Sequence, residues 1–235
     1  MIFTPEPLIA AADADSGVDP GKDASLPRRV VAEVTVASLD VRKRKLVENA
    51  HLALERGQLE YVLEVCAPIL SAAPGCLAVR RLQHRAQLLR FRKENRLRQK
   101  TAAVFARISA RRLSGDPAAS LAHADQLLGR DPTSARALRL LAEAAGRLDL
   151  RETAAFALAA IRELQPGNFA NLQALGEAWL AAGQPAEALS VANSMLAARP
   201  GDAAGLGLLR KASVAQTVAL GNWESAASFR DKIRR

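Results

Sequence analysis

The sequence predicts an all-α protein built from repeated pairs of helices, and three observations lead to this fold class. The 235 residues are rich in Ala and Leu and only 4% aromatic, which is a composition of strong helix formers. Pro132, Pro166 and Pro200 stand in DPTS, QPGN and RPGD, each 34 residues from the next. Each 34-residue segment also divides near its middle into two amphipathic patterns. A repeated two-helix unit accounts for all three observations.

Self-similarity at this period gives three consecutive units, 101–134, 135–168 and 169–202, whose internal turns are SGDP, RLDL and AAGQP. In the third unit, Gly183 suits the end of the first helix because Gly accepts a left-handed backbone there. Pro185 suits the start of the second helix, where a missing N–H group costs nothing. The break at Gly-Gln-Pro is therefore interpreted as a turn between paired helices.

The third unit resembles the tetratricopeptide repeat, whose pattern is W-x2-L-G-x2-Y, then A-x3-F, then P. Its residues in those slots are Leu172, Leu175, Gly176, Trp179, Ala188, Ala192 and Pro200. The second unit keeps size and apolarity with Leu138, Leu141, Ala142, Ala145, Ala154, Leu158 and Pro166. Unit 101–134 departs from the pattern, since Arg107 and Ile108 replace the expected Leu-Gly. The resemblance implies a right-handed α-solenoid of four to five tetratricopeptide-like helix-turn-helix repeats, stacked on one core.

Two further units complete the predicted array over 43–235. Unit 43–76 recovers the pattern with Leu46, Ala50, Ala53, Gly57, Ile69 and Pro74. The last unit, 203–235, has its turn at Gly221, four residues late, which is about one helical turn. We therefore expect a long first helix over 203–220 and a shorter closing helix over 222–234. Atypical end units are common because they cap the core.

The leader, residues 1–42, mixes Pro, Gly, Asp and Ala without sustained periodicity and is predicted to be mostly disordered. Its segment VVAEVTVASL is rich in β-branched residues and is a possible extended segment. This segment either docks on the array or joins the first helix, and the sequence alone leaves both alternatives open.

The stretch 77–100 exceeds the repeat period and carries nine basic residues against one acidic residue, or +8 of the formal net charge of +9. No Gly or Pro interrupts 77–113, which predicts one unusually long basic helix, with a break near Lys93 to Asn95 as the alternative. Such a helix is a candidate to contact nucleic-acid phosphates or an anionic surface. Its basic residues are Arg80, Arg81, Arg85, Arg90, Arg92, Lys93, Arg96, Arg98 and Lys100.

One observation weighs against that candidate. Phe91 is the one aromatic residue of the stretch, so stacking with single strands is poorly supplied. The alternative is a solvated helix, or one neutralised by the acidic leader.

A second candidate surface follows from the resemblance, which implies that the first helices of the units form a concave groove for an extended or helical peptide. Carried over slot by slot, the groove residues are Arg112, Arg136, Arg139, Glu143, Arg147, Gln173, Glu177 and Lys211. Arginine grips carboxylates with a planar fork, so an acidic peptide or the C-terminus of another protein is the expected ligand. The alternative is a set of solvated charges. The Lys and Asn set of chaperone-binding clamps in this family is not reproduced, so chaperone tails are not expected.

The sequence offers no support for catalysis, a cofactor or a metal. His51, His84 and His123 belong to no ligand-spacing pattern, and the phosphate-loop, dinucleotide and hydrolase motifs are missing. Cys66 is expected to be a buried thiol, and Cys76 to react only if its surroundings lower its pKa. No run reaches the ~18 apolar residues of a membrane span, and no signal peptide is evident.

We therefore expect a cytoplasmic, non-catalytic protein-protein interaction module, an adaptor or scaffold. Its expected partner is another protein that presents an acidic or extended segment, and nucleic-acid or anionic-surface binding through 77–100 is the alternative.

Overall fold

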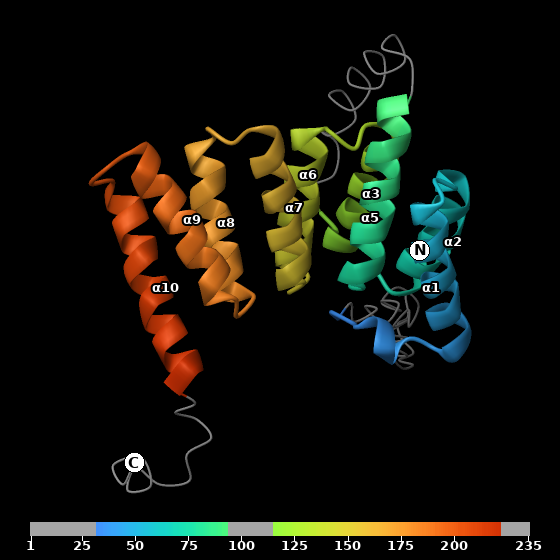
Figure 1. Ribbon diagram of the computed structural model, residues 1–235, viewed down its shortest axis with the longest axis horizontal. Coiled ribbons are helices and arrows are strands. Elements are labelled where there is room, and N and C mark those ends of the chain that lie inside the picture. Colours follow the sequence, from blue (N-terminus) through green and yellow to red (C-terminus); the bar gives the residue numbers. More distant parts are fainter. Residues whose placement is uncertain (1–31, 94–114, 222–235) are drawn as a thin grey trace, which may run out of the picture. The chain divides into compact units, whose positions relative to one another are not determined.

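The computed structural model describes residues 32–93 and 115–221, and the regular elements in these ranges are helices (Figure 1). An isolated parallel bridge between Glu33 and Gly75 is the one β-type contact among them. The elements are η1 (Val36–Ser38), α1 (Val41–Glu55), α2 (Leu59–Ala72), α3 (Leu77–Lys93), α5 (Pro117–Arg130), α6 (Ala135–Arg147), α7 (Arg151–Leu164), α8 (Phe169–Ala181), α9 (Pro185–Ala198) and α10 (Ala203–Gly221). The predicted all-α, helical-repeat class is confirmed.

Each described helix packs mainly against the described helix before it and the one after it in the chain (Figure 1). Contacts also join α1 with α3 and α8 with α10, so alternate helices approach each other as well. Packing that is confined to sequence neighbours is the property that defines a repeat array.

The turns inside three helix pairs share one backbone feature. Gly57 and Gly183 follow α1 and α8 with φ angles of +72° and +70°, in the left-handed region that Gly adopts freely. Asp149 occupies the same place after α6 with a φ of 58°. The expected helix end at Gly183 and helix start at Pro185 are confirmed by α8 and α9.

The apolar core divides into three clusters. The first is formed by α1–α3, the second by α5–α7 and the third by α8–α10. Leu158 of α7 packs against both the second and the third cluster, and Ala155 belongs to the third. The second and third clusters therefore share α7.

Gly176 shows why a slot of the repeat demands a small residue. A Cβ atom added at Gly176 would lie 2.1 Å from Cδ2 of Leu208 in α10. Leu208 is itself 2% exposed, so it is packed tightly over α8. The space that Gly176 leaves is thus filled by Leu208 of α10.

The structure describes residues 77–93 of the basic stretch. Its described part, α3, begins three residues after Pro74, and α6, α8 and α10 begin at the same distance from Pro132, Pro166 and Pro200. α3 also packs against α2 and reaches α5, as a first helix would. The expected continuation of the helix to 113 and the first helix of unit 101–134 lie outside the described residues, and the grouping of helices into units stays a prediction.

On α3, the positions that α6 and α8 fill with apolar or small residues hold Arg80, His84 and Gln87. Arg80 is 2% exposed. Its guanidinium pairs with the carboxylate of Asp125 in α5 and donates from Nη2 to the carbonyl oxygen of Pro74 at 2.9 Å. His84 lies edge-on against the ring of Phe156 in α7, with 5.6 Å between the ring centroids. These contacts join helices that precede 94–114 to helices that follow it.

We predict that Asp125→Ala lowers the free energy of unfolding by about 2–3 kcal/mol, because it leaves the buried Arg80 guanidinium without a carboxylate. Replacing both partners, Arg80→Met with Asp125→Leu, should restore most of the loss because no charge is then left unpaired. Urea denaturation followed by helical circular dichroism measures the effect. Lys211→Ala breaks an exposed pair with Glu177 and is the control, with an expected loss under about 1 kcal/mol. Equal losses in the two single variants would contradict this prediction.

We also predict that stability depends on pH through His84, because burial lowers its pKa from 6.5 to about 4. Between these values the unfolded chain binds a proton at His84 and the folded chain does not, so the free energy of unfolding falls as pH falls. At about 1.4 kcal/mol per pH unit, the loss from pH 7 to pH 5 is about 2 kcal/mol. Denaturation midpoints measured at pH 7 and pH 5 test this prediction. The loss of stability between the two pH values should be smaller in His84→Gln and unchanged in the exposed-site variant His51→Gln.

Candidate functional site

The predicted groove residues that the structure describes are all exposed and lie on alternate helices of the array. They are Arg136, Arg139, Glu143 and Arg147 on α6, Gln173 and Glu177 on α8, and Lys211 on α10. Arg112 lies outside the described residues. These side chains therefore lie on the exposed sides of α6, α8 and α10.

The structure brings two of these residues into direct contact. Nζ of Lys211 lies 2.8 Å from Oε1 of Glu177, although the two residues are 34 positions apart in the chain. Equal slots on α8 and α10 therefore face each other, and their opposite charges cancel. This contact makes the surface of α8 and α10 close to neutral at this slot.

The charged side chains of α6 do not pair with each other as Glu177 and Lys211 do. Nη2 of Arg147 donates to the carbonyl oxygen of Gly115 at 3.0 Å, so this arginine holds the segment that leads into α5. Arg139 and Glu143 point to solvent, and no ion pair engages either of them among the described residues. Arg139 is therefore a cationic group that α6 presents to solvent.

Two residues that we had assigned to the polyanion surface occupy the same slots on α3. Arg81 and Arg85 stand where α6 has Arg139 and Glu143, counting from the proline that precedes each helix. Both are exposed and neither forms an ion pair with a described residue. The constant distance from proline to helix start was the signal in the sequence that could have revealed this equivalence.

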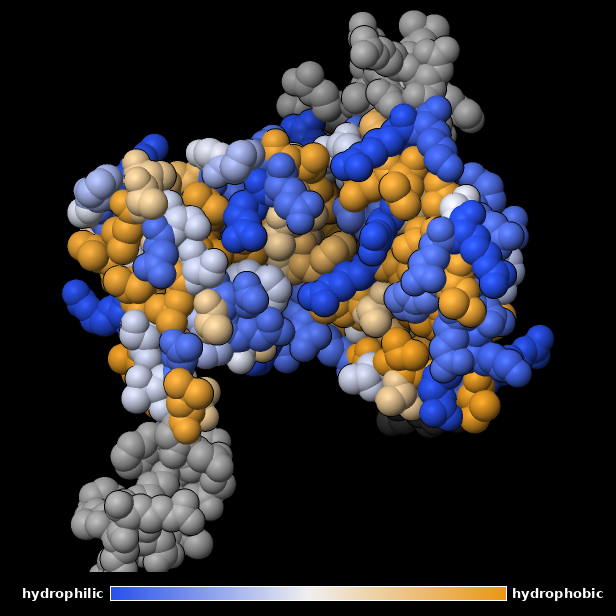
Figure 2. Space-filling view, viewed as in Figure 1, coloured by the Kyte–Doolittle hydropathy of each residue, from blue (hydrophilic) through white to orange (hydrophobic). Residues whose placement is uncertain are grey.

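The other basic residues of α3 fall into two groups. Arg80 is buried, and Arg90 donates to the carbonyl oxygen of Gly129 at 2.9 Å and lies 3.4 Å from Glu60. Arg92 and Lys93 are exposed at the end of the helix. Figure 2 shows strongly hydrophilic residues over α3 on the face turned to the viewer. Arg96, Arg98 and Lys100 lie outside the described residues.

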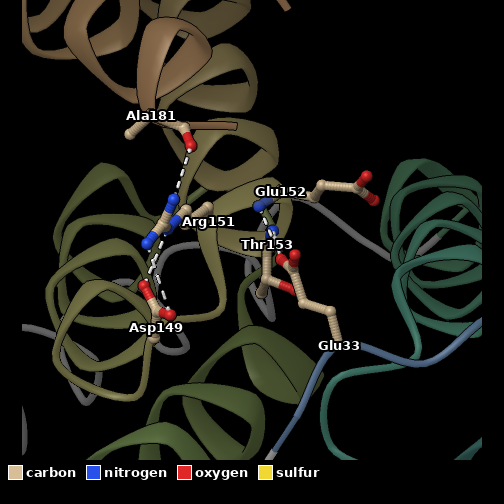
Figure 3. Close-up of polar contacts among 6 residues, drawn as sticks. All are labelled: Glu33, Asp149, Arg151, Glu152, Thr153 and Ala181. Atoms are coloured by element: carbon tan, nitrogen blue, oxygen red, sulfur yellow. Dashed lines mark hydrogen bonds and ion pairs between the residues drawn. The ribbon is translucent and has the colours of Figure 1, made fainter. Parts of the chain in front are cut away.

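A second polar site, which sequence reasoning missed, surrounds the start of α7 (Figure 3). Oε1 of Glu33 accepts from the backbone amides of Glu152 at 2.6 Å and Thr153 at 3.3 Å. On the other side of the same turn, Arg151 bonds Asp149 at 2.7 Å and the carbonyl oxygen of Ala181 at 3.3 Å. The docking alternative for the leader is therefore correct for residues 32–39, while 1–31 lie outside the described residues.

The thiols of the described residues are enclosed in the fold. Burial raises the pKa of Cys66 to about 12, so its thiol stays protonated at neutral pH. Cys76 is buried as well, and both thiols are free. In the described ranges, no three His, Cys, Asp or Glu side chains are grouped so that they could hold a metal ion. Within the same ranges, no helix has the length and apolar character needed to cross a membrane.

The order of the helices and the 34-residue spacing of their starts define an all-α helical-repeat fold, of the kind that tetratricopeptide repeats form. No protein-family model and no curated protein matches the sequence. Among solved structures, the chain is similar to TTC0263, a thermophilic TPR protein of Thermus thermophilus, with 20% identity over 74% of this chain and 81% of that chain and a TM-score of 0.34. It is also similar to the MamA protein, with 17% identity over 80% of this chain and 94% of that chain and a TM-score of 0.34.

Proposed function

We propose that this chain is a non-catalytic protein-interaction module, an adaptor or scaffold, that holds an extended acidic segment of another protein along its first helices. The observation that carries the proposal is that Arg81, Arg85 and Arg139, at matching positions of α3 and α6, are exposed and have no carboxylate partner among the described residues. Each offers a planar guanidinium that can bind a carboxylate through two parallel hydrogen bonds.

The charge pattern supports a bound segment whose acidic residues lie against α3 and α6. On α8 and α10, Glu177 and Lys211 satisfy each other, so that surface offers little attraction to a charged ligand. A partner segment with acidic residues at one end and uncharged residues at the other would match this pattern. Electrostatic matching of this kind sets the orientation and the association rate more than the affinity.

The rival function, nucleic-acid binding through the basic helix, has weaker support. Arg80 and Arg90 are committed to contacts inside the fold, so α3 presents fewer cations than its composition suggests. Glu143 shares its slot with Arg85, and a carboxylate there would repel a continuous phosphate backbone. An acidic protein segment, whose charges are spaced by side chains, tolerates such an interruption.

We predict that a fluorescent peptide of alternating Glu and Gly residues binds the protein, and that Arg85→Glu with Arg139→Glu weakens binding at least tenfold. The physical reason is that two guanidinium partners are replaced by repelling carboxylates. Fluorescence anisotropy at about 50 and 200 mM salt measures the affinity and its electrostatic share.

The control is Arg130→Glu, which makes the same change at an exposed position of α5 outside these slots. A labelled DNA duplex serves as the competing probe. If the duplex bound tightly and the Glu peptide did not, the protein-interaction proposal would be overturned in favour of the rival function.

A further inference from the structure

Residues 32–39 form a short segment, here named the strap, that lies along the loop between α2 and α3. The amide of Val34 donates to the carbonyl oxygen of Gly75 at 3.2 Å, and Glu33 and Gly75 form the parallel bridge. A Cβ atom at position 75 would lie 2.0 Å from the backbone oxygen of Ala32. Only Gly at position 75 therefore lets an extended segment lie this close.

The carboxylate of Glu33 caps the N-terminus of α7, which has no side-chain cap from its own N-cap residue. α7 follows Leu150, which offers no side-chain acceptor, whereas Ser134 and Asn168 cap α6 and α8 with their own side chains. Oε1 of Glu33 supplies the missing acceptor to the amides of Glu152 and Thr153. The positive end of the helix dipole and the nearby Arg151 guanidinium both favour an anion there.

The strap occupies a surface formed by Gly75 and the first turn of α7, which is here named the seat. Two further features belong to this seat. The hydroxyl of Thr153, in the same first turn, is fully buried and has no hydrogen-bond partner among the described residues. Val34, Val36 and Leu39 pack against the apolar cluster of α1–α3. The seat of the strap thus combines an anion site, a backbone acceptor and an apolar surface.

The strap is nevertheless held at the surface. None of its residues is buried, and its apolar side chains are only half covered. One backbone bond, one carboxylate and three half-buried side chains oppose the conformational entropy lost when eight residues become ordered. The strap therefore has few stabilising contacts for its length, and we expect it to detach from the array more readily than a packed helix does.

We infer that this seat is a receptor for an extended segment of a partner protein that carries an acidic residue followed by apolar residues at alternate positions. The strap has this pattern in Glu33, Val34 and Val36, and it fills the seat from within the same molecule. A partner segment therefore competes with the strap. The seat lies at the turns that precede α3 and α7, so the inference does not depend on the groove.

The test uses the full-length protein and a labelled peptide of the sequence AEVTVASLD, which is residues 32–40. Glu33→Gln weakens the internal competitor, so this variant should bind the peptide at least fivefold more tightly than the unchanged protein. A peptide with Gln in place of its Glu should bind the same variant more weakly. Equal affinity of the two proteins, or of the two peptides, would overturn the inference.

A second variant tests whether the peptide binds at the seat. In the Glu33→Gln background, Gly75→Ala should abolish peptide binding because the added Cβ atom excludes the extended peptide. Gly146→Ala is the matched control, since nothing lies within 4 Å of the added atom there. Peptide binding that survives Gly75→Ala would place it elsewhere and contradict the inference.

Hydrogen exchange gives a readout that does not require the Gly75 variant to fold. In Glu33→Gln, the amides of Glu152 and Thr153 should exchange faster than in the unchanged protein and slow again when the peptide is added. Exchange that the peptide leaves unchanged would overturn the inference. Concentration-dependent dimerisation of Glu33→Gln would do the same, because it would assign the seat to a second copy of the protein.

Discussion

The arrangement of the described helices depends on the buried guanidinium of Arg80. It binds Asp125 of α5 and the carbonyl oxygen of Pro74, and so ties α5 to the loop that begins α3. A buried guanidinium without partners is strongly destabilising, so α5 has to reach this place after the chain has passed through 94–114. α6 packs on α5, and each later helix packs on the one before it. The contacts of Arg80 therefore fix α5 next to α3 at the point where the array continues.

Much of the fold could be predicted because it follows from local signals. The period of the prolines located the helix starts, and the delayed turn before Gly221 predicted the long helix that α10 confirms. The distance from Pro74 gives the start of α3 in the same way, but hydrophobic periodicity does not support it. Arg80, His84 and Gln87 occupy slots where apolar residues are expected, so hydrophobic periodicity gives no sign that this helix continues the pattern.

The positions of the candidate groove residues could be predicted from the repeat pattern, but the partner that each charged side chain contacts could not. Arg147 looks equivalent to Arg139 in the sequence, yet Arg147 is bonded to Gly115 and Arg139 extends to solvent. The contact of Glu33 with α7 joins residues 119 positions apart. No local pattern encodes such a contact, because it exists only after the helices have packed.

The separation of the apolar clusters has a consequence for how the molecule unfolds. α7 contributes to both the second and the third cluster, so helices α5–α10 share buried apolar surface and should lose it together. The cluster of α1–α3 has no member in common with them among the described residues and meets them through Arg80, Arg90, His84 and Glu33. Opening this boundary would expose the buried side chains of Arg80 and His84, but it would leave the three apolar clusters intact. We therefore expect the first three helices to unfold as a cooperative block of their own.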